Sequence, residues 1–306
     1  MPHDIPYIKL SIVAAFVAST VYVHFRGRVR LGFWRQLTDH STFMAPINCL
    51  MYLFSKLPAK PYLPVAGFPE LKLLQDHWQD IRAEAFQLAE AGEIKKSDRY
   101  DDAGFNSFFK TGWTRFHLKW YGDAHPSARE LCPVTTGLLQ RIPSVKAAMF
   151  AALPPGGRLV THRDPFAGSV RYHLGLVTPN DDRCYISVDG ERYSWRDGQG
   201  VIFDETYLHY AENQSGQMRI ILFCDVERPL NNPVARWFNH VISHTLIRAA
   251  AAPNADTDKT GGINKAFGYV QQVRLLGKRI KARSRFAYYG LQWLIFGGLF
   301  AWWLLA

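Results

Sequence analysis

Two histidines and one aspartate have the residue types and the spacing of a metal site. His162 and Asp164 are separated by one residue, and His209 follows 47 residues after His162. Because alternate side chains of an extended segment point to the same side, His162 and Asp164 could face one ion, and His209 could join them from another strand. Two imidazoles and one carboxylate form the facial triad that binds Fe(II) and leaves positions open for O2 and a cosubstrate. A His-x-Asp pair alone is weak evidence, because polar loops contain it by chance.

Three further polar residues lie on segments with strand-like alternation. Arg171 and His173 share one face of the segment SVRYHLGLV, whose opposite face is apolar. Arg219 opens the apolar segment RIILFCDV, where a buried cation is costly unless an anion pairs with it. Its guanidinium could hold the distal carboxylate of 2-oxoglutarate through two parallel hydrogen bonds. The alternative is an internal partner for Arg219, with three candidates: Asp204, Glu205 and Asp225.

The elements that must position these residues are predicted to be short strands. From about residue 113, alternating or β-branched segments are separated by turn signals such as Asp189-Gly190 and Asp197-Gly198. Strands of this length and spacing are typical of an all-β sandwich or barrel. Their number fits the double-stranded β-helix, the jelly-roll core of cupins. The predicted strands are 113–120, 146–153, 169–177, 184–188, 200–203 and 219–226.

Helical and connecting segments flank this mainly β core. Apolar residues recur at helical spacing over 70–91, and Gly92 is predicted to end that helix. The segment 43–54 is apolar but too short to span a bilayer, so it suits a core helix or an interfacial or re-entrant segment. Residues 231–285 return to helical and loop composition.

Both ends of the chain carry apolar segments long enough to cross a bilayer core of about 30 Å. Residues 5–25 are followed at once by Arg26, Arg28 and Arg30, and the uncharged residues 286–306 are preceded by a basic cluster. Because positive charge marks the cytoplasmic side of a span, two uncleaved anchors with a cytoplasmic domain between them are predicted. A buried C-terminal helix of a soluble protein is the alternative for 286–306.

The net charge of +10 indicates an anionic partner or surface. Nucleic acid is not expected, because the sequence contains no zinc knuckle, helix-turn-helix pattern or aromatic RNA-binding signature. Anionic lipid is the favoured partner, because basic residues gather beside the apolar ends. The sequence does not indicate an oligomeric state. Four widely spaced cysteines without a Cys-x-x-Cys motif are expected to be reduced thiols: Cys49, Cys132, Cys184 and Cys224.

The segment that contains these candidates resembles the aspartyl/asparaginyl β-hydroxylase family of Fe(II)/2-oxoglutarate oxygenases. The motifs that carry the resemblance are HRDPFAGSVRYHLGLV, WRDGQGVIFDETYLHYAEN and RIILFCDVERP. The resemblance covers about residues 45–230 and implies the double-stranded β-helix. Within the family the chain is most similar to the lipid A 2-hydroxylases, which are enzymes of the bacterial inner membrane.

The resemblance also implies roles for the candidate residues. Three residues match the metal ligands of the family: His162, Asp164 and His209. Arg219 matches the arginine that binds the distal carboxylate of 2-oxoglutarate. Arg171 and His173 match residues that line the cosubstrate pocket. Asp164 is retained where the protein-modifying branch typically has glycine, which favours a lipid substrate. Ala151 replaces the serine with which that branch contacts 2-oxoglutarate, so no such contact is expected from position 151.

The function implied by the resemblance is 2-hydroxylation of a secondary fatty acyl chain of lipid A. Fe(II) would be the metal, O2 and 2-oxoglutarate the cosubstrates, and succinate and CO2 the other products. Two alternatives are a β-hydroxylase that acts on aspartate or asparagine of a protein, and a non-catalytic cupin-like binding module. The predicted location is the bacterial inner membrane, with the catalytic domain facing the cytoplasm.

Five segments make up the predicted domain organisation. An N-terminal membrane anchor (1–29) precedes a membrane-proximal connector and helix (30–112). The oxygenase core (113–230) follows. A helical and loop connector with the basic cluster (231–285) then leads to the C-terminal transmembrane helix (286–306).

Overall fold

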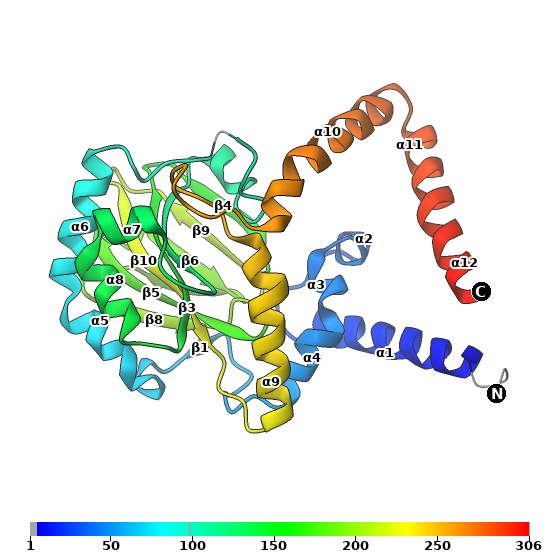
Figure 1. Cartoon of the computed structure of the whole chain (residues 1–306), viewed down its shortest axis with the longest axis horizontal. Coiled ribbons are helices and arrows are strands. Elements are labelled where there is room, and N and C mark those ends of the chain that lie inside the picture. Colours follow the sequence, from blue (N-terminus) through cyan, green and yellow to red (C-terminus); the bar gives the residue numbers. More distant parts are fainter. Residues whose placement is uncertain (1–4, 98, 306) are drawn as a thin grey trace.

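Two antiparallel β-sheets face each other in the body of the protein. The computed structural model describes residues 5–97 and 99–305 (Figure 1). The larger sheet has the strand order β1-β8-β5-β10-β3-β2, and the smaller has the order β4-β9-β6-β7. This arrangement is jelly-roll-like and confirms the predicted mainly β core. The strands are β1 (Tyr62–Leu63), β2 (Thr114–Trp120), β3 (Val145–Leu153), β4 (Arg158–His162), β5 (Ser169–Val177), β6 (Cys184–Val188), β7 (Glu191–Ser194), β8 (Gly200–Phe203), β9 (His209–Asn213) and β10 (Arg219–Glu227).

All six predicted strands are present, as β2, β3, β5, β6, β8 and β10. Four strands were not predicted: β1, β4, β7 and β9. Strand β1 lies in the range predicted to be a connector, yet Tyr62 and Leu63 pair with Phe203 and Ile202 of β8. The connector therefore contributes an edge strand to the larger sheet.

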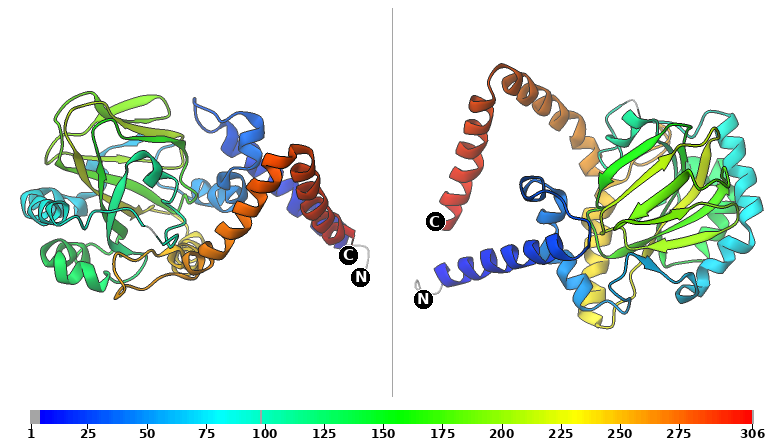
Figure 2. Two further views of the ribbon diagram at one scale, coloured as in Figure 1. Left: turned by 90° about the horizontal axis from the view of Figure 1, so that it is seen from above. Right: turned by 180° about the vertical axis from the view of Figure 1, so that it is seen from behind.

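The two faces of β5 separate the polar pocket from the helical layer. Tyr172 and Leu174 pack in a core between the larger sheet and its covering helices, together with Leu74 and Ile81. The opposite face of β5 points toward the smaller sheet, as predicted for Arg171 and His173. The helices of this layer are α5 (Lys72–Asp76), α6 (Trp78–Glu90), α7 (Pro126–Leu131) and α8 (Pro133–Gln140), which Figure 2 shows along the outer side of the sheet.

The prediction of one continuous helix over 70–91 is wrong in one respect, because the chain forms two helices separated at His77. A short 3-10 turn (Pro69–Leu71) precedes α5, and α6 begins at Trp78. The turn around Gly198 contacts both sides of the break: Gln75 Nε2 donates to the Gly198 carbonyl at 3.2 Å, and a Cβ at Gly198 would lie 2.9 Å from the Trp78 ring. This tertiary contact explains why the periodic pattern does not form one continuous helix.

The N-terminal part leaves the body as a long helix. Helix α1 (Ile5–Phe25) is the one helix of the described chain that is long and apolar enough to cross a membrane, judged by length and composition. It confirms the predicted helix, and only 6% of its apolar window is buried in the structure. Three short helices lead back to the body: α2 (Phe33–Leu37), α3 (His40–Phe43) and α4 (Ala45–Leu53).

The C-terminal part is helical almost throughout. Helix α9 (Pro233–Ile242) continues into a π-turn and a 3-10 turn, and α10 (Gly262–Arg283) carries the basic cluster away from the body. The predicted span follows as α11 (Arg285–Gln292), a π-turn (Trp293–Gly297) and α12 (Gly298–Leu305), and Ala306 lies outside the described residues. Figures 1 and 2 show these helices and α1 leaving the same side of the body. The second span stays a prediction.

Candidate active site

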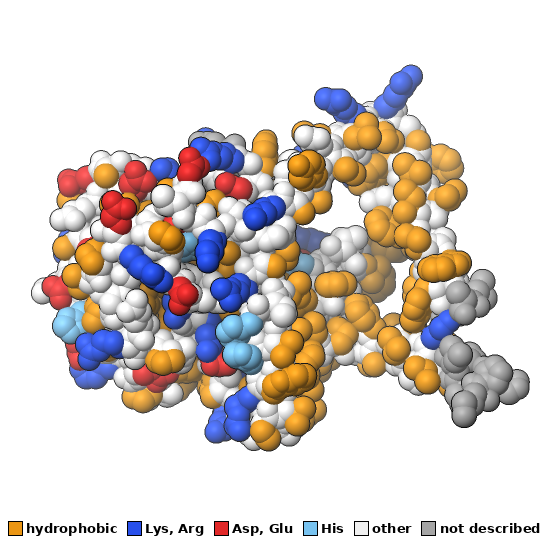
Figure 3. All heavy atoms as spheres, viewed as in Figure 1, with side chains coloured by type: hydrophobic (Ala, Val, Ile, Leu, Met, Phe, Trp, Pro, Cys, Tyr) orange, Lys and Arg blue, Asp and Glu red, His pale blue; other side chains and the backbone are white. Residues whose placement is uncertain are grey.

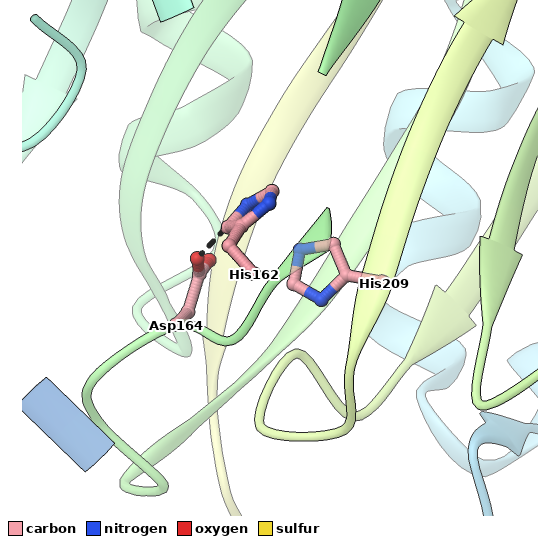
Figure 4. A group of neighbouring side chains, drawn as sticks. All are labelled: His162, Asp164 and His209. Atoms are coloured by element: carbon pink, nitrogen blue, oxygen red, sulfur yellow. Dashed lines mark ion pairs between the residues drawn. The ribbon is translucent and has the colours of Figure 1, made fainter. Parts of the chain in front are cut away.

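The three predicted metal ligands lie together between the two sheets. His162 ends β4 and His209 begins β9, and these two residues are directly paired across the strands. Asp164 follows two residues after His162, and its Oδ1 lies 3.6 Å from His162 Nε2. One candidate ligand atom from each of the three lies within 4.8 Å of the others. Figure 4 shows the side chains turned toward one another, as a common ion would require.

Both histidines are held in the tautomer that a metal ligand needs. His162 Nδ1 donates to the Val160 carbonyl at 2.7 Å, and His209 Nδ1 donates to the Tyr207 carbonyl at 2.9 Å. A carbonyl only accepts, so each Nδ1 carries the proton and each Nε2 keeps a lone pair for a metal. Burial lowers the pKa of His162, and burial with His162 nearby lowers the pKa of His209 to about 3. Both rings are therefore neutral near pH 7.

Asp164 is oriented by a buried arginine. Although burial opposes its ionisation, the Arg171 guanidinium and the two histidines hold the pKa of Asp164 well below its usual value. Arg171 Nη2 donates to Asp164 Oδ2 at 2.7 Å, and its Nε donates to Asp225 Oδ1 at 2.9 Å. Arg171 is also paired with Glu205. The carboxylate ligand is thus charged and fixed, and Arg171 supports it at the edge of the pocket.

The candidate carboxylate partners of Arg219 are used elsewhere. Glu205 and Asp225 pair with Arg171, and Asp204 pairs with Arg26 at 2.6 Å and with Arg228 at 2.9 Å. Within the described residues Arg219 makes no ion pair, although it is only 1% exposed to solvent. The alternative of an internal carboxylate partner for Arg219 is therefore wrong.

Hydrogen-bond donors without partners gather in the same pocket. Nε and Nη2 of Arg219, Nε1 of Trp195 and both ring nitrogens of His173 are buried and have no hydrogen-bond partner among residues 5–97 and 99–305. The Arg219 guanidinium lies 4.5 Å from the centre of the Trp195 ring. Burial, then Arg171 and Arg219, hold the pKa of His173 well below its usual value, so that its neutral ring offers one donor and one acceptor. Orphaned buried donors around one cation are the arrangement that a small carboxylate ligand would satisfy.

Aromatic side chains form the remaining wall of the pocket. The Phe108 ring centre lies 4.6 Å from that of His162, and Phe105 stacks on Trp113 at 5.0 Å. These residues come from the loop before β2, and all three line the pocket. Ala151, from which no contact with 2-oxoglutarate was expected, also lines the pocket, and its side chain is only a methyl group. One side of the metal centre is therefore apolar and suits a hydrocarbon group.

Among the residues that were not assigned to the site from the sequence, Trp195 lines the pocket and Arg163 lies beside it. Trp195 opens the family motif WRDGQGVIFDETYLHYAEN, but its position in a polar segment does not indicate a pocket residue. Arg163, between two ligands, is 3% exposed and donates to the Val23 carbonyl at the end of α1. The buried positions of both residues follow from contacts with segments distant in the sequence, which a local pattern does not encode.

The donor set fits Fe(II) and 2-oxoglutarate. Two neutral imidazoles and one ionised carboxylate match the ligand set of non-haem iron oxygenases. The partnerless donors beside Arg219 match the distal carboxylate of a keto diacid. The sequence-predicted residues are thus brought together in one pocket, with Arg171 serving the carboxylate ligand rather than offering a free guanidinium.

Comparisons with known proteins agree with this geometry. The profile of the Aspartyl/Asparaginyl beta-hydroxylase family matches residues 75–229. An ornithine lipid ester-linked acyl 2-hydroxylase from Rhizobium tropici is 32% identical over 196 residues, which cover 63% of this chain and 69% of that protein. The human aspartyl/asparaginyl beta-hydroxylase is 28% identical over 194 residues, which cover 61% of this chain and 25% of that protein.

Among solved structures, a prolyl-4-hydroxylase from Pseudomonas putida aligns over 51% of this chain and 88% of its own, with 18% identity and a TM-score of 0.34. This TM-score is too low to establish a fold, which rests instead on the strand order described above. The family profile covers half of the chain and includes all three metal-ligand candidates and Arg219. The chain therefore belongs to the aspartyl/asparaginyl β-hydroxylase family, as its sequence motifs predicted.

Proposed function

We propose that this protein is an Fe(II)- and 2-oxoglutarate-dependent dioxygenase that 2-hydroxylates a fatty acyl chain of a membrane lipid, with a secondary acyl chain of lipid A as the predicted substrate. One observation carries the proposal. A His-Asp-His cluster shares its pocket with a buried arginine that has no carboxylate partner in the described part of the chain. The first suits Fe(II), and the second suits the far end of 2-oxoglutarate.

The protein's own residues would have separate tasks. His162, Asp164 and His209 would hold the iron, which when bound supplies the activation of O2. Arg219 would bind the distal carboxylate of 2-oxoglutarate, and the side chains of Trp195 and His173 would donate to the cosubstrate. Arg171 would keep Asp164 ionised and aligned through its hydrogen bond to Oδ2. In the overall reaction one oxygen atom of O2 enters the acyl C–H bond, the other enters succinate, and CO2 leaves.

The apolar wall would orient the acyl chain. Phe105, Phe108 and Trp113 present rings beside His162, so that a hydrocarbon chain packed against them lies next to the metal. Only a held carbon atom reacts selectively, because proximity and orientation decide which C–H bond is attacked.

A lipid substrate is supported by three observations. The Rhizobium relative is named for hydroxylation at position 2 of an ester-linked acyl chain of a lipid. Asp164 is present where the protein-modifying branch typically lacks the carboxylate. Helix α1 suits an anchor in the membrane, and Lys9 Nζ at its outer end donates to the Trp303 carbonyl of α12 at 2.9 Å. This contact supports a second span beside α1. The basic residues that follow α1 support a catalytic domain at the cytoplasmic face of the inner membrane.

The second candidate function is hydroxylation of aspartate or asparagine in a protein, which is the activity that the name of the human relative states. This chain spans about a quarter of that protein's length. The apolar rings beside His162 favour an acyl chain over a polar peptide side chain. Lipid A and ornithine lipid both present an acyl carbon next to a carbonyl, so the pocket does not separate them.

The test uses the full chain expressed in a bacterium that lacks 2-hydroxylated lipids. Mass spectrometry of the extracted lipid A and ornithine lipid should detect a species with one added oxygen atom, and fragmentation should locate it on C2 of an acyl chain. A His162→Ala variant should not produce it. Product on ornithine lipid alone would correct the predicted substrate, and product on neither lipid, with succinate release driven by an Asp- or Asn-containing peptide, would favour the second function.

A further inference from the structure

The segment that links α1 to the body is built into the wall of the metal site. Arg163, between two metal-ligand candidates, donates from Nη1 to the Val23 carbonyl in the last turn of α1 at 2.9 Å. His40 Nε2 donates to the Arg163 carbonyl at 2.6 Å, and Arg35 Nη2 donates to the Thr161 carbonyl at 2.8 Å. The strand end that carries His162 is thus held by three contacts to residues 23–40.

A second set of contacts fixes the same segment on the other ligand strand. Arg26 is buried, pairs with Asp204 at 2.6 Å and donates to Thr206 Oγ1 at 2.9 Å. Asp204 and Thr206 lie in the turn that leads to His209. The Arg26 guanidinium also lies between the rings of Tyr52 and Tyr207, at 4.0 and 4.1 Å from their centres. The end of α1 therefore has a fixed position relative to both halves of the metal site.

Helix α2 lies beside this end of α1 and turns an apolar face outward. Its buried residue Gln36 accepts from His24 of α1 and from Arg163, each at 3.4 Å. On the opposite face, Phe33, Trp34 and Leu37 are 64%, 77% and 49% exposed. These three residues, called the α2 face below, do not pack against the body. In water such a cluster of large apolar side chains is unfavourable unless something covers it.

We infer that a phospholipid bilayer covers the α2 face, so that Phe33, Trp34 and Leu37 lie in the headgroup and upper acyl region and hold the metal site at the membrane surface. The inference rests on the proposed span of α1 but not on hydroxylase activity. Three observations favour a bilayer over a protein partner. The face belongs to a helix that contacts the end of α1, and the apolar window of α1 is only 6% buried. Arg30 in the link between the two helices is exposed, and its positive charge would attract anionic headgroups.

The third observation is the chemistry and surroundings of the α2 face. Tryptophan next to arginine is the composition of a segment lying in a membrane interface. Figure 3 shows hydrophobic side chains along α1 and the C-terminal helices, with Lys and Arg at the outer bend of the latter, whereas charges of both signs are spread over the body. Val160, on the strand that ends in His162, is also 46% exposed and extends the apolar surface toward the metal site. A membrane at this level would deliver an acyl chain to the pocket without removing it fully from the bilayer.

The experiment places a nitroxide spin label at single positions of the full chain in nanodiscs of phosphatidylethanolamine and phosphatidylglycerol. The background is Cys49→Ala, because the other three cysteines are buried. Labels at Trp34→Cys, at Val21→Cys in α1 and at Phe86→Cys in α6 are compared. Phe86 is 46% exposed and belongs to α6, which Figure 1 shows on the side of the body far from α1, so it is the matched aqueous control. Relaxation by lipid-soluble O2 and by a water-soluble nickel chelate is measured at each.

The label at position 34 should be relaxed more by O2 than by the chelate, as at position 21, and the label at position 86 should show the reverse. If position 34 instead follows position 86 while position 21 remains in lipid, the inference is overturned and the span stands. If position 21 also follows position 86, the span and the inference both fail. Shielding of position 34 from both reagents, with spin–spin broadening that vanishes on dilution with unlabelled protein, would assign the face to a second copy of the chain and overturn the inference.

Discussion

Replacing Arg219 with methionine should make the protein more stable and the cosubstrate site weaker. Arg219 is a buried cation that pairs with no carboxylate of the residues that the structure describes, and burial lowers its pKa from 12.5 to about 10. At about 1.4 kcal/mol per pH unit, this corresponds to about 3 kcal/mol of unfavourable free energy in the folded protein. Loss of the contact with the Trp195 ring offsets about 1 kcal/mol of that gain. Arg219→Met should therefore raise the free energy of unfolding by about 2 kcal/mol.

The same substitution should weaken binding of 2-oxoglutarate. Two charge-assisted hydrogen bonds contribute about 1.5–3 kcal/mol each, or roughly 3–6 kcal/mol together. Because about 1.4 kcal/mol is a tenfold change in affinity, the dissociation constant should rise by roughly a hundredfold to ten-thousandfold. Arg219→Lys keeps the charge but loses the planar two-point contact, so its affinity should lie between those of the wild type and the methionine variant.

The two effects are measured separately. Chemical denaturation in detergent micelles without metal gives the stability, and anaerobic calorimetry with Mn(II) in place of Fe(II) gives the affinity for 2-oxoglutarate. Unchanged affinity in Arg219→Met would refute the assignment of Arg219 to the cosubstrate. A loss of stability by 2 kcal/mol or more would show instead that an internal anion compensates this arginine, contrary to the observed pairing of Asp204, Glu205 and Asp225.

Three further outcomes are expected. His162→Ala should abolish tight binding of Mn(II) in calorimetry with little change in the circular dichroism spectrum, and retained affinity would exclude His162 as a ligand. Arg26→Gln should lower the free energy of unfolding by about 3 kcal/mol, because it breaks a buried pair with Asp204. The exposed control Arg28→Gln should change it by less than about 1 kcal/mol, and equal effects would contradict this reasoning. Burial, with a smaller effect of a neighbouring arginine, lowers the pKa of His117 from 6.5 to about 4, so the unfolded chain takes up this proton first and stability falls as the pH falls from 6.5 to 4. The stability of the wild type relative to His117→Gln should thus drop by up to about 3 kcal/mol between pH 7 and pH 4, and a constant difference would show that folding does not shift the pKa of His117.

The strands that could be predicted from the sequence are those with a buried apolar face. Residues 169–177 and 219–226 alternate because one face meets the helical layer, and both form strands of the larger sheet. Strands β4 and β9 were missed because their sequences, RLVTH and HYAEN, are mixed and polar. Polar side chains of these strands face the metal pocket or solvent. The strands that carry His162 and His209 therefore lack the apolar pattern by which strands are found.

The site was predictable where side-chain chemistry carries the information, and not where the backbone or a distant segment does. His162, Asp164, His209 and Arg219 are recognisable from residue type and from the family motifs. The carbonyls that fix the two histidine tautomers belong to Val160 and Tyr207, and any residue type would offer the same group. Likewise, the three carboxylates proposed as partners for Arg219 could be assigned to other arginines only after folding, because Arg26 is 178 residues from Asp204.

The contact between Arg163 and α1 ties the chemistry of the site to the membrane anchor. Arg163 is buried, and its Nη1 is satisfied by the Val23 carbonyl at the end of α1. Asp204 likewise depends in part on Arg26, one residue beyond that helix. Removal of the anchor would leave Arg163 without this acceptor and Asp204 without one of its two arginines, and a buried charge that loses its partner is strongly destabilising. Since these residues lie beside both ligand strands, the end of α1 is part of the metal site's support and not only a tether. This explains why the side chain of Arg26, directly after an apolar helix, is buried in the protein instead of lying among lipid headgroups.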